Sequence, residues 1–406
     1  MTADAGLKVV RLGARGDGIA ETAQGERYLP FALPGECVAA AGGGLPELLS
    51  APSPERRAPR CRHFGVCGGC VAQHMGERLY ADWKRGILED ALHKRGLRPE
   101  LAPLSPIAAG SRRRAVLTGR CVKGQSLLGY HPRNSDAIFE VLECPVLVPE
   151  IVAALPALRA LIAAIGAHEV RLTVLATATG LDVAIASGRG LDGKRAARLA
   201  QIAAAEPRLA RLTLNGDSIA QRSVPVLGFA GVEVSPPPGA FVQAVAAAEG
   251  AIAEEVKAVT AKVRRAADLF CGVGTLSLRL ARGTAVAAYD SDGAALAALR
   301  AAARHAKGLK PIEAKLRDLM REPLSARELD GFDAVVFDPP RAGAMAQAAA
   351  LARSRVPIVV AVSCHPGTLA RDLRILVDGG YQLERVLPID QFLFSAHVEA
   401  VAYLKR

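Results

Sequence analysis

The sequence lacks the long, unbroken apolar run that a secretory signal or a membrane-spanning helix requires. Its first residues, MTADAGLKVVRLGARGDG, contain no apolar core of signal-peptide length. The most apolar stretch, residues 151–168, is interrupted by Pro156 and Arg159, which argues against membrane insertion. The sequence also contains no internal repeat. We therefore expect a cytoplasmic protein without a membrane partner, and nothing in the sequence points to an obligate protein partner.

The composition excludes a disordered chain and a single small core. Hydrophobic residues make up 50% of the sequence and charged residues 22%, which is typical of a soluble globular protein. A chain of 406 residues is too long for one ordinary hydrophobic core. Two or three domains are expected.

Basic residues outnumber acidic ones, and the surplus is concentrated after residue 50. Lys plus Arg number 51 against 40 Asp plus Glu, which gives a net charge of +11. Residues 51–150 carry 16 basic and 10 acidic side chains, whereas residues 1–50 carry 4 and 6. This balance favours a polyanionic partner that contacts the chain after residue 50. The side chains best suited to phosphate contacts are Arg112, Arg113, Arg114 and Arg133.

Eight cysteines in a reducing compartment indicate metal ligands, a nucleophile or core residues before they indicate disulfides. Cys61, Cys67 and Cys70 lie within ten residues, and two glycines before Cys70 permit a tight turn around a metal. A fourth ligand is required, and the candidates are Cys121 and Cys144. Four thiolates can hold either tetrahedral zinc or an iron–sulfur cluster, and the spacing leaves both open.

Changes in local pattern divide the chain into three predicted domains. Residues 1–50 alternate apolar and polar positions around Gly-rich turns, which predicts the short strands of a small β-barrel or sandwich. A Pro- and Arg-rich link then opens a central α+β domain, residues 51–236, that contains the cysteine cluster. The PPPG turn at 236–239 marks the start of a third domain, residues 237–406.

The third domain alternates strand-like runs with Ala-rich segments of helical length, which predicts a doubly wound α/β sheet. The last two runs are joined by a loop too short for a crossover and should pair antiparallel. Seven strands ending in such a pair resemble the class I S-adenosylmethionine-dependent methyltransferases. The strand-like runs are residues 266–270, 285–290, 312–318, 334–338, 357–363, 381–390 and 397–406.

Two motifs of this domain predict a cofactor site. The stretch DLFCGVGTLS at 268–277 reads as a strand, a Gly-rich turn and a helix start, where the backbone can approach a ligand closely. The next strand ends in Asp290, whose carboxylate could accept both hydroxyls of a ribose. The motif FDPPRAG at 337–343 then favours S-adenosylmethionine over a dinucleotide. Amino-directed methyltransferases place an aromatic ring after DPP, but here Arg341 follows, which argues against methylation of an exocyclic nitrogen.

Together the motifs resemble the RNA uracil-C5 methyltransferase family over nearly the whole chain. The first fifty residues look like the TRAM domain of that family, and the matching motifs follow in the family's order: CRHFGVCGGC, DLFCGVGT, FDPPRAG, VSCHPGTLARD and DQFLFSAHVE. The resemblance implies that Cys364 is the nucleophile that adds to uracil C6, because thiolate addition places negative charge on C5. It also implies that Glu399 removes the C5 proton so that the thiol can leave.

The resemblance further implies ligands for both cofactors. It assigns the fourth ligand of a 4Fe-4S cluster to Cys144 and leaves Cys121 in the core. The implied substrate is structured RNA, with ribosomal RNA favoured over transfer RNA because of the TRAM-like module. The chain departs from the family at His365, Val245 and Leu393. The implied contacts with S-adenosylmethionine are Gln243, Phe270, Thr275, Asp290, Asp318 and Asp338.

Three other functions fit parts of the pattern. A transfer-RNA uracil-C5 methyltransferase would use the same residues. An RNA cytosine-C5 methyltransferase would use the same addition chemistry with its nucleophile in a different context. A metal-containing RNA-binding protein without turnover would explain the basic central region but not the combination of Cys364 with Glu399.

Overall fold

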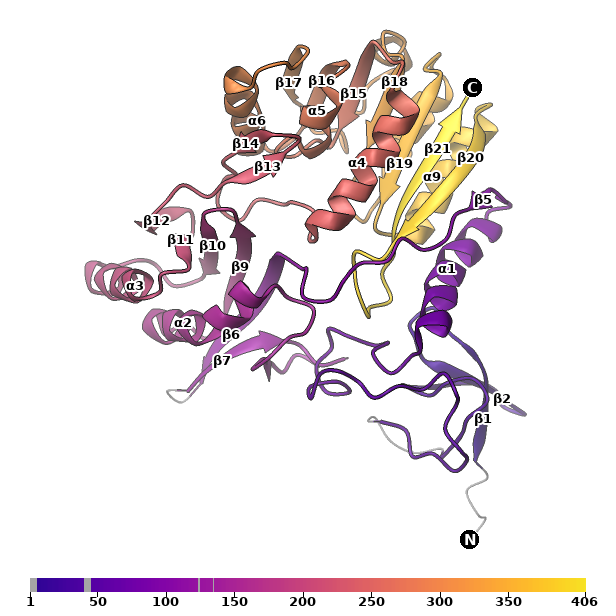
Figure 1. Ribbon diagram of the computed structural model, residues 1–406, viewed down its shortest axis with the longest axis vertical. Helices are drawn as coiled ribbons and strands as arrows, with labels where there is room; N and C mark the ends of the chain where they lie inside the picture. Colours follow the sequence, from indigo (N-terminus) through magenta and orange to yellow (C-terminus); the bar gives the residue numbers. More distant parts are fainter. Residues whose placement is uncertain (1–5, 40–44, 123–124, 134) are drawn as a thin grey trace.

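The computed structural model describes residues 6–39, 45–122, 125–133 and 135–406. Within these ranges it contains sheets of four, seven, two and eight strands. The eight-stranded sheet lies at one end of the molecule and the four-stranded sheet at the other (Figure 1). Residues 1–5 and 40–44 of the predicted first domain lie outside the described residues, and the boundaries at 50 and 236 stay predictions. No described helix combines the length and apolarity needed to span a membrane.

The eight-stranded sheet confirms the predicted methyltransferase architecture. Its strand order is β17-β16-β15-β18-β19-β21-β20-β5. Neighbours from β17 to β19 are parallel, and β21 pairs antiparallel with both β19 and β20. The predicted C-terminal hairpin is therefore present. The strands are β15 (Arg265–Leu269), β16 (Ala285–Asp290), β17 (Ile312–Leu316), β18 (Ala334–Phe337), β19 (Ile358–Ser363), β20 (Gln382–Ile389), β21 (Glu399–Lys405) and β5 (Glu100–Leu101).

Helices cover both faces of this sheet, as the strands' near-continuous apolar sequences require. Alternate strand residues belong to two separate core clusters, with Val336 and Val360 in one and Val335 and Val359 in the other. The first cluster includes residues of α4 (Ala246–Thr260), α5 (Thr275–Leu280) and α6 (Gly293–His305). The second includes residues of α1 (Glu77–His93), α7 (Ala326–Leu329), α8 (Met345–Ala352) and α9 (Pro366–Asp378).

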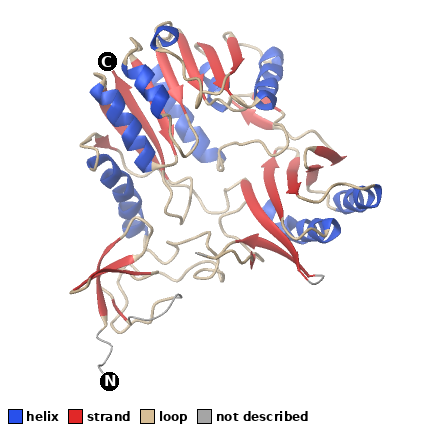
Figure 2. Ribbon diagram, turned by 180° about the vertical axis from the view of Figure 1, so that it is seen from behind, coloured by secondary structure: helices blue, strands red, loops and turns tan. Residues whose placement is uncertain are grey.

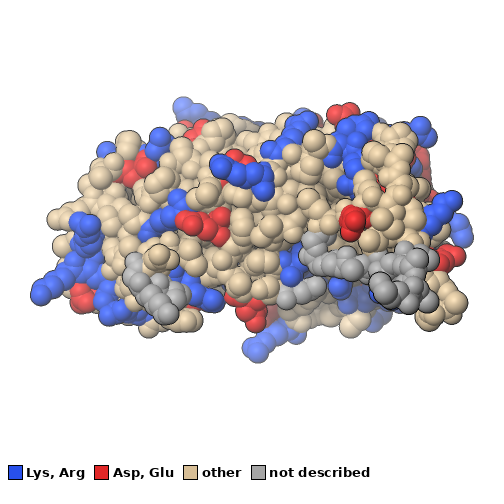
Figure 3. Space-filling model, turned by 90° about the horizontal axis from the view of Figure 1, so that it is seen from below, with Lys and Arg blue, Asp and Glu red and all other residues tan. Residues whose placement is uncertain are grey.

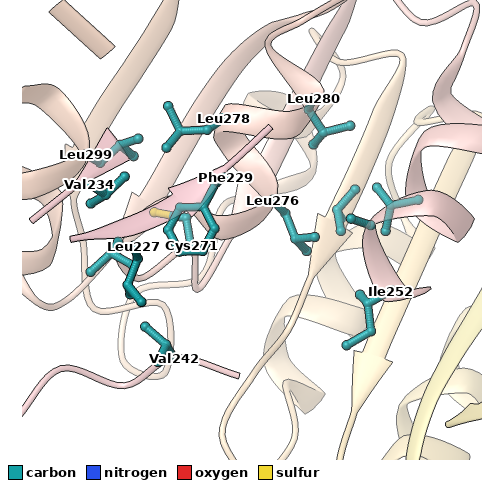
Figure 4. Packing of buried hydrophobic residues seen from close by; sticks show 14 of the residues in the cluster. Leu227, Phe229, Val234, Val242, Ile252, Cys271, Leu276, Leu278, Leu280 and Leu299 are labelled. Carbon is teal, nitrogen blue, oxygen red and sulfur yellow. The ribbon is translucent and has the colours of Figure 1, made fainter. Parts of the chain in front are cut away.

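A small hairpin closes the outer side of the first cluster. Strands β13 (Leu227–Phe229) and β14 (Val232–Val234) pair antiparallel. Phe229 of this hairpin lies beside Cys271, among leucines of α5 and α6 (Figure 4). Cys271 is 6% exposed, which agrees with its predicted packing role.

Two elements from the first quarter of the chain complete the eight-stranded sheet, which the sequence analysis did not anticipate. Strand β5 adds in parallel to β20, and α1 packs against α9. Leu88 and Leu92 of α1 are almost fully buried in the second core cluster. A two-residue strand carries no periodic signal in the sequence, so this pairing could not be read from the pattern.

The central seven-stranded sheet has the order β12-β11-β10-β9-β6-β7-β8, with α2 (Pro149–Ile165) and α3 (Gly193–Ala205) packed against it. In Figure 2 its strands and these two helices form a unit apart from the eight-stranded sheet. Leu155, Leu158 and Ile162 of α2 are buried in its core. The strands are β6 (Arg114–Val122), β7 (Gln125–Tyr130), β8 (Phe139–Glu140), β9 (Val170–Thr177), β10 (Gly180–Ser187), β11 (Leu209–Leu214) and β12 (Asp217–Gln221).

The N-terminal sheet is antiparallel and has the order β3-β2-β1-β4. Its core is small, and Val9, Ala20 and Val38 are among the buried residues. The described part of the chain between β4 and α1 contains neither a helix nor a strand, apart from isolated bridges. The predicted cysteine ligands Cys61, Cys67 and Cys70 lie in this irregular segment. The strands are β1 (Leu7–Leu12), β2 (Gly18–Thr22), β3 (Gly25–Leu29) and β4 (Cys37–Val38).

Candidate active site

A cavity of about 530 Å³ opens where the carboxyl ends of β15, β16, β18 and β19 meet. Open α/β sheets bind their ligands at this edge. The predicted catalytic and cofactor residues all line the cavity, although they come from seven separate segments of the chain. They are Gln243, Phe270, Thr275, Asp290, Asp318, Asp338, Cys364 and Glu399.

The Gly-rich turn after β15 has the backbone shape that the sequence predicts. Phe270, Gly272 and Gly274 all have positive φ angles, of 64°, 53° and 89°. A Cβ atom at position 274 would lie 2.3 Å from Leu299, so only glycine fits there. Asp290 fixes the turn from the next strand, since its Oδ2 accepts a hydrogen bond of 2.8 Å from the Gly272 N–H.

A second carboxyl group lies beneath this turn. Asp268 is 1% exposed, and its side chain accepts a 2.5 Å hydrogen bond from the Ser277 hydroxyl of α5. Burial raises the pKa of Asp268 to about 7. The bond ties the end of β15 to the first helix turn and so holds the loop between them.

The half-buried carboxyl group of Asp338 and the buried one of Glu399 are joined by a chain of two amides. Gln243 Nε2 donates to Asp338 Oδ2 at 2.7 Å, and Gln243 Oε1 accepts from Gln391 Nε2 at 2.7 Å. The same Gln391 nitrogen donates to Glu399 Oε2 at 2.8 Å. Burial, together with the nearby Asp338 charge, raises the pKa of Glu399 well above its ordinary value. Desolvation raises the pKa of Asp338 to about 6, although the Gln243 hydrogen bond opposes this.

Cys364 follows β19 directly and faces the start of β21. Ser363 pairs with Ala400 in the antiparallel ladder, so Cys364 and Glu399 occupy the next positions on the two strands. Burial raises the pKa of the thiol to about 11, with a further contribution from Glu399, while Arg341 acts in the opposite direction. At neutral pH the thiol of the free protein is therefore protonated.

The loop between β20 and β21 carries Gln391 and is held by α1. Lys84 of α1 is fully buried and lies 2.9 Å from Asp390 Oδ1. Its ammonium group also donates to the carbonyls of Phe392 and His397. Tyr80, one helical turn earlier, donates its hydroxyl to Asp390 at 2.8 Å. Two side chains from the N-terminal half thus fix the backbone next to the cavity.

A second cavity, of about 550 Å³, contains all four predicted cluster ligands. Cys61, Cys67, Cys70 and Cys144 line it, each partly exposed. Burial raises the pKa of Cys70 to about 12, with smaller contributions from the other three thiols and an opposing hydrogen bond with Gln73. Among the described residues, however, no three His, Cys, Asp or Glu side chains are arranged to hold a metal ion. The set of donors fits a thiolate-bound metal, but the side chains are not in a coordinating arrangement.

The two cavities share part of their lining. Arg112, Arg341 and Phe392 line both, and the Arg112 guanidinium lies 5.9 Å from the centre of the Phe392 ring. Arg341 also lies 3.1 Å from His397 Nε2. Burial and then Arg341 lower the pKa of His397 to about 4, so this ring is neutral and can accept from the guanidinium.

Two of the arginines predicted to contact phosphate are engaged within the protein. Arg113 pairs with the buried Glu249 at 2.6 Å, and Arg133 forms two hydrogen bonds with Asp17. These side chains join elements rather than face outward. Figure 3 shows other Lys and Arg side chains along the length of the lower face, with acidic groups between them.

The departures from the family pattern have local structural effects. His365 is the N-cap of α9, and its Nδ1 accepts from the Thr368 N–H at 3.2 Å. Val245 is the N-cap of α4 and provides no side-chain acceptor. Neither change removes a group from the cavity wall.

Sequence reasoning missed Gln391, Lys84 and Tyr80 as contributors to the site. Gln391 lies within the DQFLFSAHVE motif, so the signal for it was present. Lys84 and Tyr80 occupy a helix that reads as an ordinary amphipathic segment, and only the packing of α1 shows their contacts.

A family model and the relatives found by sequence agree on one family. A family model described as tRNA (uracil-5-)-methyltransferase matches residues 208–406. An uncharacterized RNA methyltransferase of Rhizobium meliloti is 48% identical over 98% of this chain and 99% of that protein. A 23S rRNA (uracil(1939)-C(5))-methyltransferase of Chromohalobacter salexigens is 32% identical over all of this chain and 90% of that protein.

A solved structure supports the fold over the full chain. The Pyrococcus abyssi tRNA (uracil-54, C5)-methyltransferase, in complex with S-adenosyl-L-homocysteine, superposes with a TM-score of 0.77. The superposition covers 100% of both chains at 22% sequence identity. The two proteins therefore share their architecture.

Proposed function

Because the chain belongs to the RNA (uracil-5)-methyltransferase family, we propose that it methylates C5 of one uridine in structured RNA, with Cys364 as nucleophile and Glu399 as base. The observation that carries this proposal is that a thiol and a buried carboxyl group occupy facing strand ends in one cavity with the Gly-rich turn. Thiols and carboxyl groups are the groups that addition to C6 and proton removal from C5 require.

The reaction begins when the Cys364 thiol releases its proton to solvent and the resulting thiolate bonds to C6 of the uracil ring. The electron pair of the C5–C6 double bond moves to C5 and the O4 enolate, which makes C5 nucleophilic. S-adenosylmethionine, when bound, would supply the electrophilic methyl group to C5, and S-adenosylhomocysteine would leave with the electron pair of the broken sulfur–methyl bond. Glu399 then takes the C5 proton, the double bond re-forms, and the bond between Cys364 and C6 breaks to release the thiolate.

The cavity wall divides into two groups of residues in this proposal. Asp290, on the second strand, would accept the ribose hydroxyls, since its carboxylate retains lone pairs beyond the two N–H groups that it binds. Asp338 would lie between the cofactor and the target base. Gln243, Phe270, Thr275 and Asp318 would complete the contacts with S-adenosylmethionine.

We propose large-subunit ribosomal RNA as the substrate. The 23S rRNA enzyme of Chromohalobacter salexigens aligns with the entire chain, including the N-terminal strands, and supports this choice. The Pyrococcus abyssi enzyme acts on tRNA, which makes transfer RNA the alternative to test. A target base must leave its stack to reach Cys364, at a cost of roughly a few kcal/mol. A loop nucleotide would meet this requirement most easily.

We further propose that Cys61, Cys67, Cys70 and Cys144 bind a 4Fe-4S cluster. Cys144 lines their cavity, whereas Cys121 on β6 does not, and this favours Cys144 as the fourth ligand. A closed cluster at this site would hold the irregular segment in place rather than react. Zinc bound by the same thiolates is the alternative.

Mass mapping of RNA from a gene-deletion strain tests the function directly. One uridine in 23S rRNA should lack its C5 methyl group and regain it when purified protein and S-adenosylmethionine are added. A methyl group missing from transfer RNA would reject the ribosomal assignment only. A missing 5-methylcytidine would reject the uracil chemistry, and an unchanged methylation pattern would reject the enzyme assignment.

A further inference from the structure

The cavity wall contains a buried hydrogen-bond acceptor without a donor. Gln391 is 2% exposed, and its Oε1 has no hydrogen-bond partner among the described residues. Glu399 Oε1, on the neighbouring side chain, also has none. Buried polar atoms are nearly always paired, so an unpaired acceptor beside a cavity marks a place where a ligand donor fits.

The hydrogen-bond chain fixes the orientation of the Gln391 amide. Gln243 must turn its nitrogen toward the Asp338 carboxyl group, which leaves its oxygen toward Gln391. Gln391 must therefore present its nitrogen to Gln243, and the same nitrogen also reaches Glu399. Both protons of that nitrogen are used, whether or not Glu399 is ionised. The oxygen of Gln391 remains as an acceptor that requires a donor.

The geometry of a pyrimidine identifies that donor. In the proposed reaction Glu399 acts at C5, and Gln391 is its direct neighbour at 2.8 Å. Along the ring edge away from C6, the positions after C5 are C4 and then N3. Uracil carries a proton on N3, whereas cytosine has a lone pair there. A hydrogen-bond acceptor opposite N3 therefore binds uracil and repels cytosine.

We propose that Gln391 Oε1 accepts the N3–H of the target uracil and thereby selects uracil against cytosine. This assignment rests on the proposed function and adds a specificity-determining residue to it. Binding cytosine would bury two acceptors against each other and leave both unpaired, which a hydrogen-bonding site rejects strongly. The amide chain also holds this residue rigidly, because it is anchored at Asp338 and Glu399.

Covalent trapping with fluorinated RNA tests the proposal apart from the role of Glu399. A fluorine at C5 cannot leave as a proton, so the adduct with Cys364 accumulates without proton removal. The probes are large-subunit rRNA and transfer RNA transcripts that contain either 5-fluorouridine or 5-fluorocytidine. Gln391→Met should trap the fluorouridine RNA about 10- to 100-fold more slowly than wild type. The ratio of its trapping rate with fluorouridine RNA to its trapping rate with fluorocytidine RNA should be smaller than in wild type.

Three controls separate the possible causes of a slower reaction. Gln347→Met removes another buried glutamine, one that bonds only to the Leu324 backbone, and should leave the trapping rate unchanged. Gln391→Asn keeps the amide but withdraws its oxygen, and should repeat the defect if Gln391→Met does not fold. The affinity for S-adenosylhomocysteine should stay within about twofold in the Gln391 variants.

The outcomes distinguish failure of this assignment from failure of the proposed function. If wild-type protein traps neither RNA, the uracil chemistry fails and this assignment fails with it. If wild type traps fluorouridine RNA and both Gln391 variants trap it equally fast, only this assignment is wrong. It is also wrong if the variants lose affinity for S-adenosylhomocysteine but keep the base preference, because the oxygen would then serve the cofactor.

Discussion

The two cavities of the molecule are built in opposite ways. The cavity that contains Cys364 and Glu399, here called the reaction cavity, takes these residues from the ends of adjacent strands. The sheet therefore sets the distance between the two side chains. The cysteine cavity takes most of its residues from a segment without regular structure. The first is connected by a continuous chain of hydrogen bonds, whereas the second contains thiols with little to hold them. The sheet thus sets the positions of Cys364 and Glu399 directly, whereas no regular element sets the positions of Cys61, Cys67 and Cys70.

Removing each of the two thiols in the reaction cavity separately is expected to give the largest difference in activity. Cys364 and Cys271 both line it, but only Cys364 follows β19 and faces Glu399. Cys364→Ala should lower methyl transfer by at least about 10⁴-fold, because no other group can add to C6. Cys271→Ala should keep activity within a few fold. Equal losses in both variants, measured by transfer of labelled methyl groups, would contradict the assignment.

Removing the buried ammonium of α1 tests how far the two regions depend on each other. Lys84→Met leaves Asp390 buried without its ion-pair partner, so the free energy of unfolding should fall by about 3–5 kcal/mol. Denaturant titration followed by circular dichroism measures this change.

The double variant Lys84→Met with Asp390→Asn should regain part of the lost stability, because the uncompensated charge is gone. A single variant as stable as wild type would show that the loop does not depend on α1.

Cysteine substitutions test whether the cavity lined by Cys61, Cys67, Cys70 and Cys144 binds a metal cluster. After anaerobic purification, Cys144→Ser should contain less than about half of the wild-type iron, because a four-iron cluster needs four thiolates. Cys121→Ser should match wild type, since this residue lies outside the cavity. Iron and zinc assays with absorbance spectra measure the outcome. Stoichiometric zinc without iron in the wild-type protein would show that the four thiols bind zinc and not an iron–sulfur cluster.

The smallest expected effect concerns the acidity of the Cys364 thiol. Arg341 lowers the pKa of Cys364, which burial raises to about 11, so Arg341→Met should raise this pKa further. Below pH 11 the thiolate fraction falls as the pKa rises. Alkylation of Cys364 by iodoacetamide at pH 8 should therefore slow by about three- to tenfold.

The control for this measurement is Arg114→Met, because Arg114 lines the same cavity with its guanidinium over Phe241. Its alkylation rate should stay within about twofold of wild type, as read by mass spectrometry of the labelled peptide. Faster alkylation in Arg341→Met would reverse the sign of the proposed charge effect.

The order of strands explains why so much of the reaction cavity could be predicted. Parallel strands place their carboxyl ends at one edge, so Phe270, Asp290, Asp338 and Cys364 had to meet there once the strands were recognised. The antiparallel last strand brings Glu399 to the same edge. The N-terminal β-barrel stays a prediction, since the structure shows a four-stranded antiparallel sheet in the described residues.

Contacts between distant segments explain what the sequence could not show. Strand β5 is two residues long, and the burial of Lys84 depends on a loop that lies 300 residues later in the chain. The polarity of the Gln391 amide follows only from three linked hydrogen bonds. Such features arise from tertiary packing, to which no local pattern corresponds.

The carbonyl of Phe394 accepts hydrogen bonds from the Val71 and Ala72 N–H groups, immediately after Cys70. The irregular segment that carries Cys70 is thus hydrogen-bonded directly to the loop between β20 and β21. A shortened protein beginning at residue 237 would retain seven of the eight strands of its sheet, yet it would expose the apolar face that α1 normally shields. The loop between β20 and β21 would also lose its hydrogen bonds with Val71 and Ala72 and its ion pair with Lys84. We therefore expect residues 237–406 to be unstable as an isolated domain. The N-terminal segments stabilise the sheet and the loop that line the reaction cavity.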